Sequence, residues 1–295
     1  MLCLDSVLQA THGSPIGPVA LMSHLRPSYG SFSGVVPHHE GMPAIIGQFH
    51  YNLGDYTARL TYLLPEEQLD AQSLAVLLET MVVEAGERGA LNLLAEIDEN
   101  HPAFESLRGV GFSVYSRQHI WRFSGLESDG VKPKNRWESA STASDYAVRQ
   151  LYQSVVPPLI QGAEAMNART VYGLALRQDG ELRGFVESIF GPRGIYLLPV
   201  LHPDIEDVGQ IFHDLLVSLP SLLGRPVYIA IRDYQSWLSG VMEDLKGVSS
   251  PRKALMVKHL ATRQRVSAPS TLQTVLEKRG VESTSPMNPI ETKNN

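Results

Sequence analysis

Four pairs of residues recur at an almost constant distance along this chain of 295 residues. Gly41 and Gly180 are 139 positions apart, and Pro65 and Pro203 are 138 apart. Gly111 and Gly247 are 136 positions apart, as are Arg122 and Lys258. This period has the length of a domain and is far too long for a solenoid repeat. The spacing therefore predicts a tandem duplication, which limits the fold to two copies of one unit.

Composition changes mark the ends of these units. The stretch "SGLESDGVKPKNR" is polar and rich in turn residues, as linkers are, and the chain after Gln264 is rich in Ser, Thr, Pro and Asn. We predict an N-terminal domain at 1–123, a linker at 124–136, a C-terminal domain at 137–263 and a mobile tail at 264–295.

Hydrophobic periodicity predicts the same order of elements in both halves, namely a hairpin, a strand, a helix, a strand, a short helix and a closing strand. In the first half we expect strands within 34–51, a strand at 56–65, a helix from about 71 that ends near Gly86 or Gly89, a strand at 91–98, a short helix at 101–109 and a closing strand or hairpin at 112–123. In the second half we expect a hairpin at 170–190, strands at 194–203, 226–233 and 253–261, a helix at 205–224 that is interrupted near Pro220, and a helix at 235–247. Each half also has room for first helices, at about 15–30 and 144–161.

Charge and cysteine content exclude several classes of protein. A net charge of −6 disfavours a broad nucleic-acid surface, which needs a basic face. Cys3 is the single cysteine, so no intrachain disulfide forms and a reducing compartment fits. We expect no secretory leader, no membrane span and a cytoplasmic protein. His38 and His39 are adjacent on a predicted strand and point to opposite faces, so we expect no metal site there.

One segment has the features of a helix start that follows a strand. Pro65-Glu66 ends the third predicted strand, and "QLDAQS" (68–73) then opens the long helix with two small residues, Ala71 and Ser73. Helix starts expose unpaired N–H groups that hold phosphate well. An ordinary capped helix start is the alternative, since Asp70 can cap those N–H groups itself.

Together with the order of elements, these residues resemble the N-acetyltransferase (GNAT) superfamily. That family has a hydrophobic-Pro-Glu segment, here Leu64-Pro65-Glu66, followed by a pyrophosphate loop of pattern [Q/R]-x-x-G-x-[G/A]. It often has an Asn-x-x-Ala motif after the next strand, here Asn100 to Ala103, and then Gly-Phe, here Gly111-Phe112. The resemblance covers about residues 30–123 and 137–262.

The resemblance implies an α+β fold with a mixed sheet, in two tandem acyl-CoA N-acyltransferase-like domains. In each, helices flank a mostly antiparallel sheet. Acetyl-CoA or another acyl-CoA is the implied cosubstrate. The residues that the resemblance assigns to its binding are Leu64, Gln68, Ala71, Gln72, Ser73 and Asn100.

The departures from the family pattern bear on activity. The family's loop glycines allow the backbone to approach pyrophosphate, whereas this chain has Ala71 and Ser73, with the carboxylate of Asp70 beside them. The corresponding loop of the second half contains Glu206, Asp207 and Ile211 and is unfit for coenzyme A. The N-terminal domain is therefore the expected donor site.

The catalytic groups are also incomplete. Family members commonly protonate the leaving thiolate with a tyrosine one turn before Gly-Phe, and Leu107 has that position here, with Met242 or Glu243 in the second half. Glu96 and Asp98, at the end of a predicted strand, are possible bases, although such acids are more often solvated. The catalytic residues are therefore unknown.

Two functions follow as expectations. The first is an N-acyltransferase that moves an acetyl or acyl group to a small-molecule or peptide amine. The alternative is a non-catalytic pseudoenzyme with a tandem GNAT-like fold that binds a ligand or a protein. A homodimer that pairs strand edges is a weaker third possibility.

Overall fold

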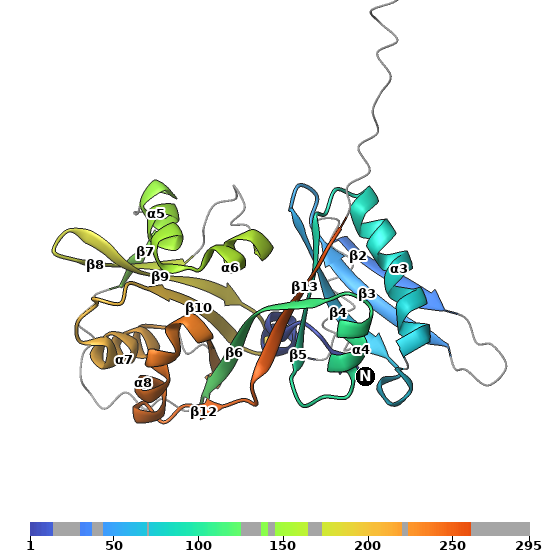
Figure 1. Ribbon diagram of the computed structural model, residues 1–295. Helices are drawn as coiled ribbons and strands as arrows, with labels where there is room; N and C mark the ends of the chain where they lie inside the picture. The colour runs from blue at the N-terminus through green and yellow to red at the C-terminus, as the bar shows by residue number, and fades with distance from the viewer. Residues whose placement is uncertain are drawn as a thin grey trace, which may run out of the picture. The chain divides into compact units, whose positions relative to one another are not determined.

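Helices and strands follow one another twice in the same order in the computed structural model (Figure 1). It describes residues 1–13, 30–36, 44–69, 71–124, 137–140, 145–164, 173–219 and 224–260. Met1–Thr262 forms one compact unit. The predicted linker and tail lie almost entirely outside the described residues, so the predicted domain boundaries stay predictions.

Within the described residues of the first half, every strand and helix predicted from the sequence is present. Its elements are β1 (Leu2–Cys3), α1 (Ser6–His12), β2 (Gly30–Val36), β3 (Ile45–Tyr51), β4 (Thr57–Leu64), a 3-10 helix (Glu66–Gln68), α3 (Ala71–Glu87), β5 (Asn92–Asp98), α4 (Ala103–Gly109) and β6 (Ser113–Phe123). The short β1 and α1 are not among the predicted elements. The predicted first helix at about 15–30 lies almost wholly outside the described residues.

The second half also follows the prediction, with two differences in its helices. Its elements are β7 (Trp137–Ser139), α5 (Asp145–Val155), α6 (Pro158–Ala163), β8 (Gly173–Gln178), β9 (Glu181–Phe190), β10 (Ile195–Leu201), α7 (Val208–Ser218), β11 (Val227–Arg232), a 3-10 helix (Asp233–Leu238), α8 (Ser239–Asp244), β12 (Val248–Ser249) and β13 (Lys253–His259). The helix predicted at about 144–161 is divided into α5 and α6, and the helix predicted at 235–247 is divided into the 3-10 helix and α8. The helix predicted at 205–224 is α7, which ends at Ser218, just before the predicted interruption near Pro220; residues 220–223 lie outside the described residues.

All the strands belong to one mixed sheet, which joins the halves by exchanging their last strands. Its order is β2-β3-β4-β5-β13-β6-β11-β10-β9-β8-β7, with β1 beside β4 and β12 beside β6. The last strand of the second half, β13, pairs with β5 of the first, while β6 pairs with β11 of the second. Figure 1 shows β6 and β13 side by side where the halves meet. In the first half β5 is therefore next to β13 and not next to β6, and in the second half β11 is next to β6 and not next to β13.

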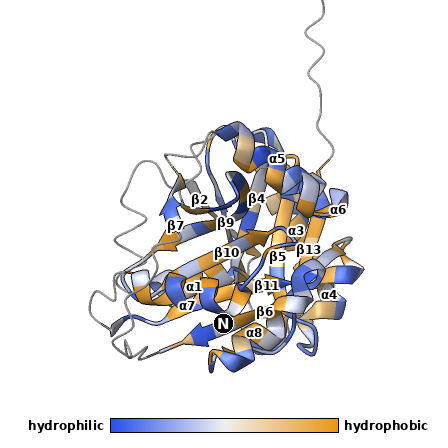
Figure 2. Ribbon diagram, turned by 90° about the vertical axis from the view of Figure 1, so that its left-hand side faces the viewer, coloured by the Kyte–Doolittle hydropathy of each residue, from blue (hydrophilic) through white to orange (hydrophobic). Residues whose placement is uncertain are grey.

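Hydrophobic residues run along the central strands of this sheet (Figure 2). Because successive side chains of a strand point to opposite faces, these residues pack on both faces of the sheet. On β5, Leu93 and Ala95 pack in the cluster beneath α3, whereas Leu94 packs with residues of α6. On β10, Leu197 packs with α7, whereas Tyr196 packs with Ala10 of α1. The halves thus exchange helices as well. Helix α1 of the first half packs on β9 and β10 of the second, and helix α6 of the second half packs on β5 and β6 of the first.

The long helix α3 lies against its sheet through the stripe that periodicity predicts. Its apolar positions Leu74, Leu77, Leu78, Met81 and Ala85 are all buried. Gly47 on β3 permits this close packing, since a Cβ there would lie 3.0 Å from side-chain atoms of Leu77 and Met81. Burial of this stripe, rather than helix propensity, holds α3 in place.

None of the described helices combines the length and the apolar character that crossing a bilayer requires.

Candidate functional site

The parallel strands β4 and β5 pair along only part of their length. Their register runs from Thr57 opposite Asn92 to Arg59 opposite Leu94, and the strands then separate although both continue. We call the gap between residues 60–64 of β4 and 95–98 of β5 the first wedge. Strands that separate in this way turn backbone N–H and C=O groups toward the space between them, where those groups need other partners.

A β-bulge on β4 turns the backbone carbonyl of Thr61 toward the first wedge. The pairing of β3 with β4 shifts between Gln48, opposite Tyr62, and Phe49, opposite Leu60, which leaves Thr61 as the extra residue. The Thr61 hydroxyl donates to the Gln48 carbonyl at 3.0 Å. Bulges bend a strand and redirect its backbone, and here the Thr61 carbonyl faces the first wedge.

The first wedge contains the chain's own residues 2–4. β1 pairs antiparallel with β4, placing Leu2 opposite Leu63 and Cys3 opposite Tyr62. The Leu4 N–H then donates to the Thr61 carbonyl, and the Leu4 carbonyl accepts from the Glu96 N–H of β5, both at 2.9 Å. Leu4 is 1% exposed and joins the cluster beneath α3. One residue therefore bridges the two separated strands.

The second half has a matching wedge, closed in a different way. β10 and β11 pair only from Ile195 opposite Val227 to Leu197 opposite Ile229. Beyond this point the side-chain amide of Gln235 donates to the Pro199 carbonyl and accepts from the Leu201 N–H, each at 2.8 Å. Gln235 is 1% exposed.

These contacts fall at equivalent positions of the two halves. With Pro65 aligned on Pro203, Thr61 corresponds to Pro199 and Leu63 to Leu201. The same backbone positions are therefore bonded to protein groups in both wedges. In the first wedge the partner is the segment of residues 2–4, and in the second wedge it is the side chain of Gln235.

The predicted donor-binding residues surround the mouth of the first wedge. Leu64 is the last residue of β4, Gln68 ends the 3-10 helix, and Ala71, Gln72 and Ser73 open α3. Gln72 is exposed and Ser73 buried. The side chains of Gln68 and Ala71, and all of Asp70, lie outside the described residues.

Asn100 belongs to the same region although it follows another strand. Its N–H donates to the Asp98 carboxylate at 2.9 Å in the turn after β5. The next residue, His101, bonds Glu66 through Nε2 at 2.9 Å. The Ala103 N–H donates to Nδ1 of the same ring at 3.1 Å, so Nδ1 is an acceptor and Nε2 is the atom that donates to Glu66. The hydrogen bond from His101 lowers the pKa of Glu66 and ties the two predicted segments together.

Of the three residues named for the family's tyrosine position, Leu107 and Met242 have no proton to donate, and the third, Glu243, is exposed. Leu107 and Met242 are both fully buried in apolar clusters. Glu96, one of the possible bases, is 5% exposed and accepts from the Ser6 N–H at 3.3 Å and the Gln118 amide at 3.1 Å. Burial raises its pKa. These contacts fix α1 to β5 and leave Glu96 almost no access to an acceptor.

A charged group that the sequence did not reveal lies between the halves. The Arg232 guanidinium bonds both oxygens of the Glu164 carboxylate, at 2.9 and 3.1 Å, and the Tyr115 hydroxyl donates to the same carboxylate. Burial alone would raise the pKa of Glu164, but Arg232 and Arg59 outweigh it and the pKa is lowered. This buried pair joins the end of α6 to β11 and, through Tyr115, to β6.

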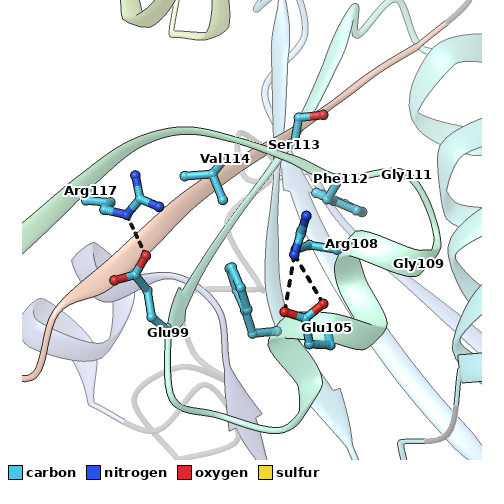
Figure 3. Close-up of a pocket in the computed structure, with 10 residues that line it drawn as sticks. Glu99, Glu105, Arg108, Gly109, Gly111, Phe112, Ser113, Val114 and Arg117 are labelled. Atoms are coloured by element: carbon cyan, nitrogen blue, oxygen red, sulfur yellow. Dashed lines mark hydrogen bonds and ion pairs between the residues drawn. The ribbon is translucent and has the colours of Figure 1, made fainter.

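A separate pocket of about 810 Å³ lies between α4 and the start of β6 (Figure 3). Its charged residues are paired with one another, Arg117 with Glu99 at 2.5 Å and Arg108 with Glu105 at 3.3 Å. None of the predicted donor-binding residues lines it. Within the described ranges, no three His, Cys, Asp or Glu residues gather as metal ligands would.

Comparison with known proteins gives structural matches only. No family model matches the chain, and no curated protein matches it. A GCN5-related N-acetyltransferase from Kribbella flavida is 13% identical and covers 81% of this chain and 93% of its own, with a TM-score of 0.50. A tandem GNAT protein from the clavulanic acid biosynthesis pathway is 15% identical and covers 87% of this chain and 94% of its own, with a TM-score of 0.47.

At these identities the similarity concerns the fold, and the match with a TM-score of 0.50 bears on it. That match extends over most of both chains, so the mixed sheet and its flanking helices belong to the shared fold. This chain has the fold of the GCN5-related N-acetyltransferases.

Proposed function

We propose that the chain is an acyl-CoA-dependent N-acyltransferase whose donor site is the first wedge. The observation that carries the proposal is the separation of β4 from β5 beside the loop that opens α3. Phosphate groups held at that helix start would direct the rest of the donor between the two strands. The amide groups of its pantetheine arm would then meet the backbone N–H and C=O groups of β4.

The chemistry in this proposal is direct transfer. The nitrogen of a small-molecule or peptide amine attacks the thioester carbonyl, the carbon–sulfur bond breaks, an amide forms and coenzyme A leaves as the thiolate. The attacking nitrogen gives one proton to water and the thiolate takes one proton from water, because Leu107 has none to give, so the products are the amide and the thiol of coenzyme A. Positioning of the two reactants supplies most of the rate in such a site. We assign no catalytic residue.

Substitution of Ala71 by glutamate should abolish donor binding. A carboxylate at the start of α3 would cap its N–H groups and repel phosphate. We expect Ala71→Glu to weaken acetyl-CoA binding by about 100-fold, the effect of one unfavourable charge in a phosphate site. Calorimetric titration of the variant with acetyl-CoA measures it.

Gly209→Glu is the matched control, since it places the same charge at the start of α7. A Cβ at Gly209 meets nothing within 4 Å, so the substitution is compatible with the structure. Acetyl-CoA affinity should be unchanged in this variant. The reverse pattern, loss in Gly209→Glu and none in Ala71→Glu, would assign the donor site to the second half.

A non-catalytic binding protein is the second candidate, favoured by a specific observation. In both halves the backbone positions that would meet the donor already have protein partners, Leu4 in one and Gln235 in the other. This candidate predicts no heat of binding and no thermal shift with millimolar acetyl-CoA, in the unmodified chain or in a variant with an opened first wedge.

A further inference from the structure

The first strands of the two halves lie in different places. β7, which begins the second half, pairs with β8 at the edge of the sheet. β1, which begins the first half, is paired with β4 in the first wedge instead of with β2. Since the two halves otherwise repeat one order of elements, the position of β1 needs its own explanation.

Residues 2–4 and a donor arm would use the same groups. The Thr61 carbonyl and the Glu96 N–H are bonded to Leu4, and the Leu2 side chain is also buried, at 7% exposed. A molecule lying between β4 and β5 cannot share these groups with a strand already there. We propose that residues 2–4 are an internal plug of the first wedge, and that acyl-CoA binds only when they leave it. The inference rests on the proposed donor site.

Before Leu4, the Met1 ammonium pairs with the Glu66 carboxylate at 3.1 Å, and this ion pair must separate when the plug leaves. After Leu4, the contacts of α1 do not depend on the plug. Asp5 caps α1 by accepting from the Leu8 N–H at 3.0 Å. The carbonyl of Thr11, near the other end of α1, accepts from the Arg193 N–H at 2.9 Å on the second half. The helix therefore stays anchored through its own contacts when the segment before it is released. Release is then a local opening, of the kind that short elements with few contacts undergo.

The single cysteine of the chain lies within the plug and reports on its release. Burial raises the pKa of the Cys3 thiol from 9.0 to about 11, and its Sγ lies 3.5 Å from the Asp5 carbonyl. The thiolate is the reactive form, so at neutral pH the shift alone slows alkylation about 100-fold relative to a thiol of ordinary pKa. When residues 2–4 leave the first wedge, Cys3 becomes an ordinary thiol.

The first experiment measures alkylation of Cys3 by N-ethylmaleimide in the full chain, with and without acetonyl-CoA, a non-hydrolysable donor analogue that has no free thiol. We expect the labelling rate to rise at least about 10-fold and to saturate with the analogue. Calorimetry on the same samples shows whether the analogue is bound. Bound analogue with unchanged or slower labelling would overturn the plug and leave the donor site intact.

The second experiment weakens the plug directly. Leu4→Pro removes the N–H that bonds the Thr61 carbonyl, whereas the control Leu4→Met retains both backbone bonds and nearly the same volume. We expect Leu4→Pro to bind acetonyl-CoA at least about 10-fold more tightly than Leu4→Met, because an occupied site lowers apparent affinity. Equal binding in both variants contradicts the plug alone. Absence of binding in both contradicts the donor site and the plug together. If Leu4→Pro does not fold, labelling of the unmodified chain still decides the proposal.

Discussion

Replacement of Arg232 by methionine should lower the free energy of unfolding by about 3–5 kcal/mol, the cost of breaking a buried ion pair from one side. The guanidinium is 8% exposed and the Glu164 carboxylate 17% exposed, and they form two hydrogen bonds. Without Arg232 the Glu164 carboxylate stays buried and keeps the hydrogen bond from the Tyr115 hydroxyl. Urea denaturation at pH 7 measures the loss.

Arg108→Met is the control, because Arg108 pairs with Glu105 at the surface, where the two side chains are 56% and 72% exposed. Exposed pairs contribute about 0–1 kcal/mol. A loss of less than about 1 kcal/mol in Arg232→Met as well would show that the buried pair does not hold the halves together.

The same pair predicts how stability depends on pH. The folded-state pKa of Glu164 is lowered from its ordinary 4.5, so its contribution is fully present above the ordinary value and is lost as pH falls through the lowered value. In Arg232→Met, burial would raise that pKa and protonation would then relieve the buried charge. Between about pH 6 and pH 3 the unmodified chain should therefore lose more stability than the variant. Urea midpoints across this range test it, and an equal loss in both would contradict the assignment.

Replacement of Gln235 by leucine should also be strongly destabilising, by about 2–6 kcal/mol if each orphaned group costs about 1–3 kcal/mol. The side chain is 1% exposed and satisfies both the Pro199 carbonyl and the Leu201 N–H of the second wedge. Leucine is similar in size but leaves both groups without these bonds. Thermal and urea unfolding of the variant measure the effect.

Gln153→Leu provides the comparison, since Gln153 is an exposed residue of α5. Such surface substitutions change stability by less than about 0.5 kcal/mol. Similar stabilities of the two variants would mean that the amide of Gln235 does not close the second wedge.

The sequence predicted the elements and their repetition because both depend on local pattern. Asp179-Gly180 between alternating strands predicts a hairpin turn, and both residues have the positive φ, 51° and 82°, that such a turn needs. The buried stripe of α3 follows from 3.6-residue periodicity. Trp121 and Phe123 on β6 are both buried in the cluster beneath α7, as the apolar alternation of that strand leads one to expect.

Which strands pair could not be predicted from those patterns. Alternation shows that a strand has one or two buried faces, but it carries no information on its neighbour. The placement of β13 between β5 and β6 therefore had no signal of its own. β1 is too short for periodicity, and Gln235 lies in a stretch that predicts an ordinary helix.

The candidate site was predictable only in part, for a related reason. Motif spacing located the loop before α3 and the turn at Asn100, which the Glu66–His101 bond brings together. The occupant of the first wedge comes from residues about 60 positions before that loop. Glu164 and Arg232 are 68 positions apart, and a single charged residue gives no hint of so distant a partner.

Hydrogen–deuterium exchange of the full chain, with and without saturating acetonyl-CoA, tests the central claim most directly. If the first wedge is the donor site and residues 2–4 are its plug, amides of residues 2–4 exchange faster with ligand. Those of residues 71–76 exchange more slowly, while residues 199–214 are unchanged. Slower exchange at 199–214 instead, or no change in residues 2–4 and 71–76 at saturating ligand, would contradict the account.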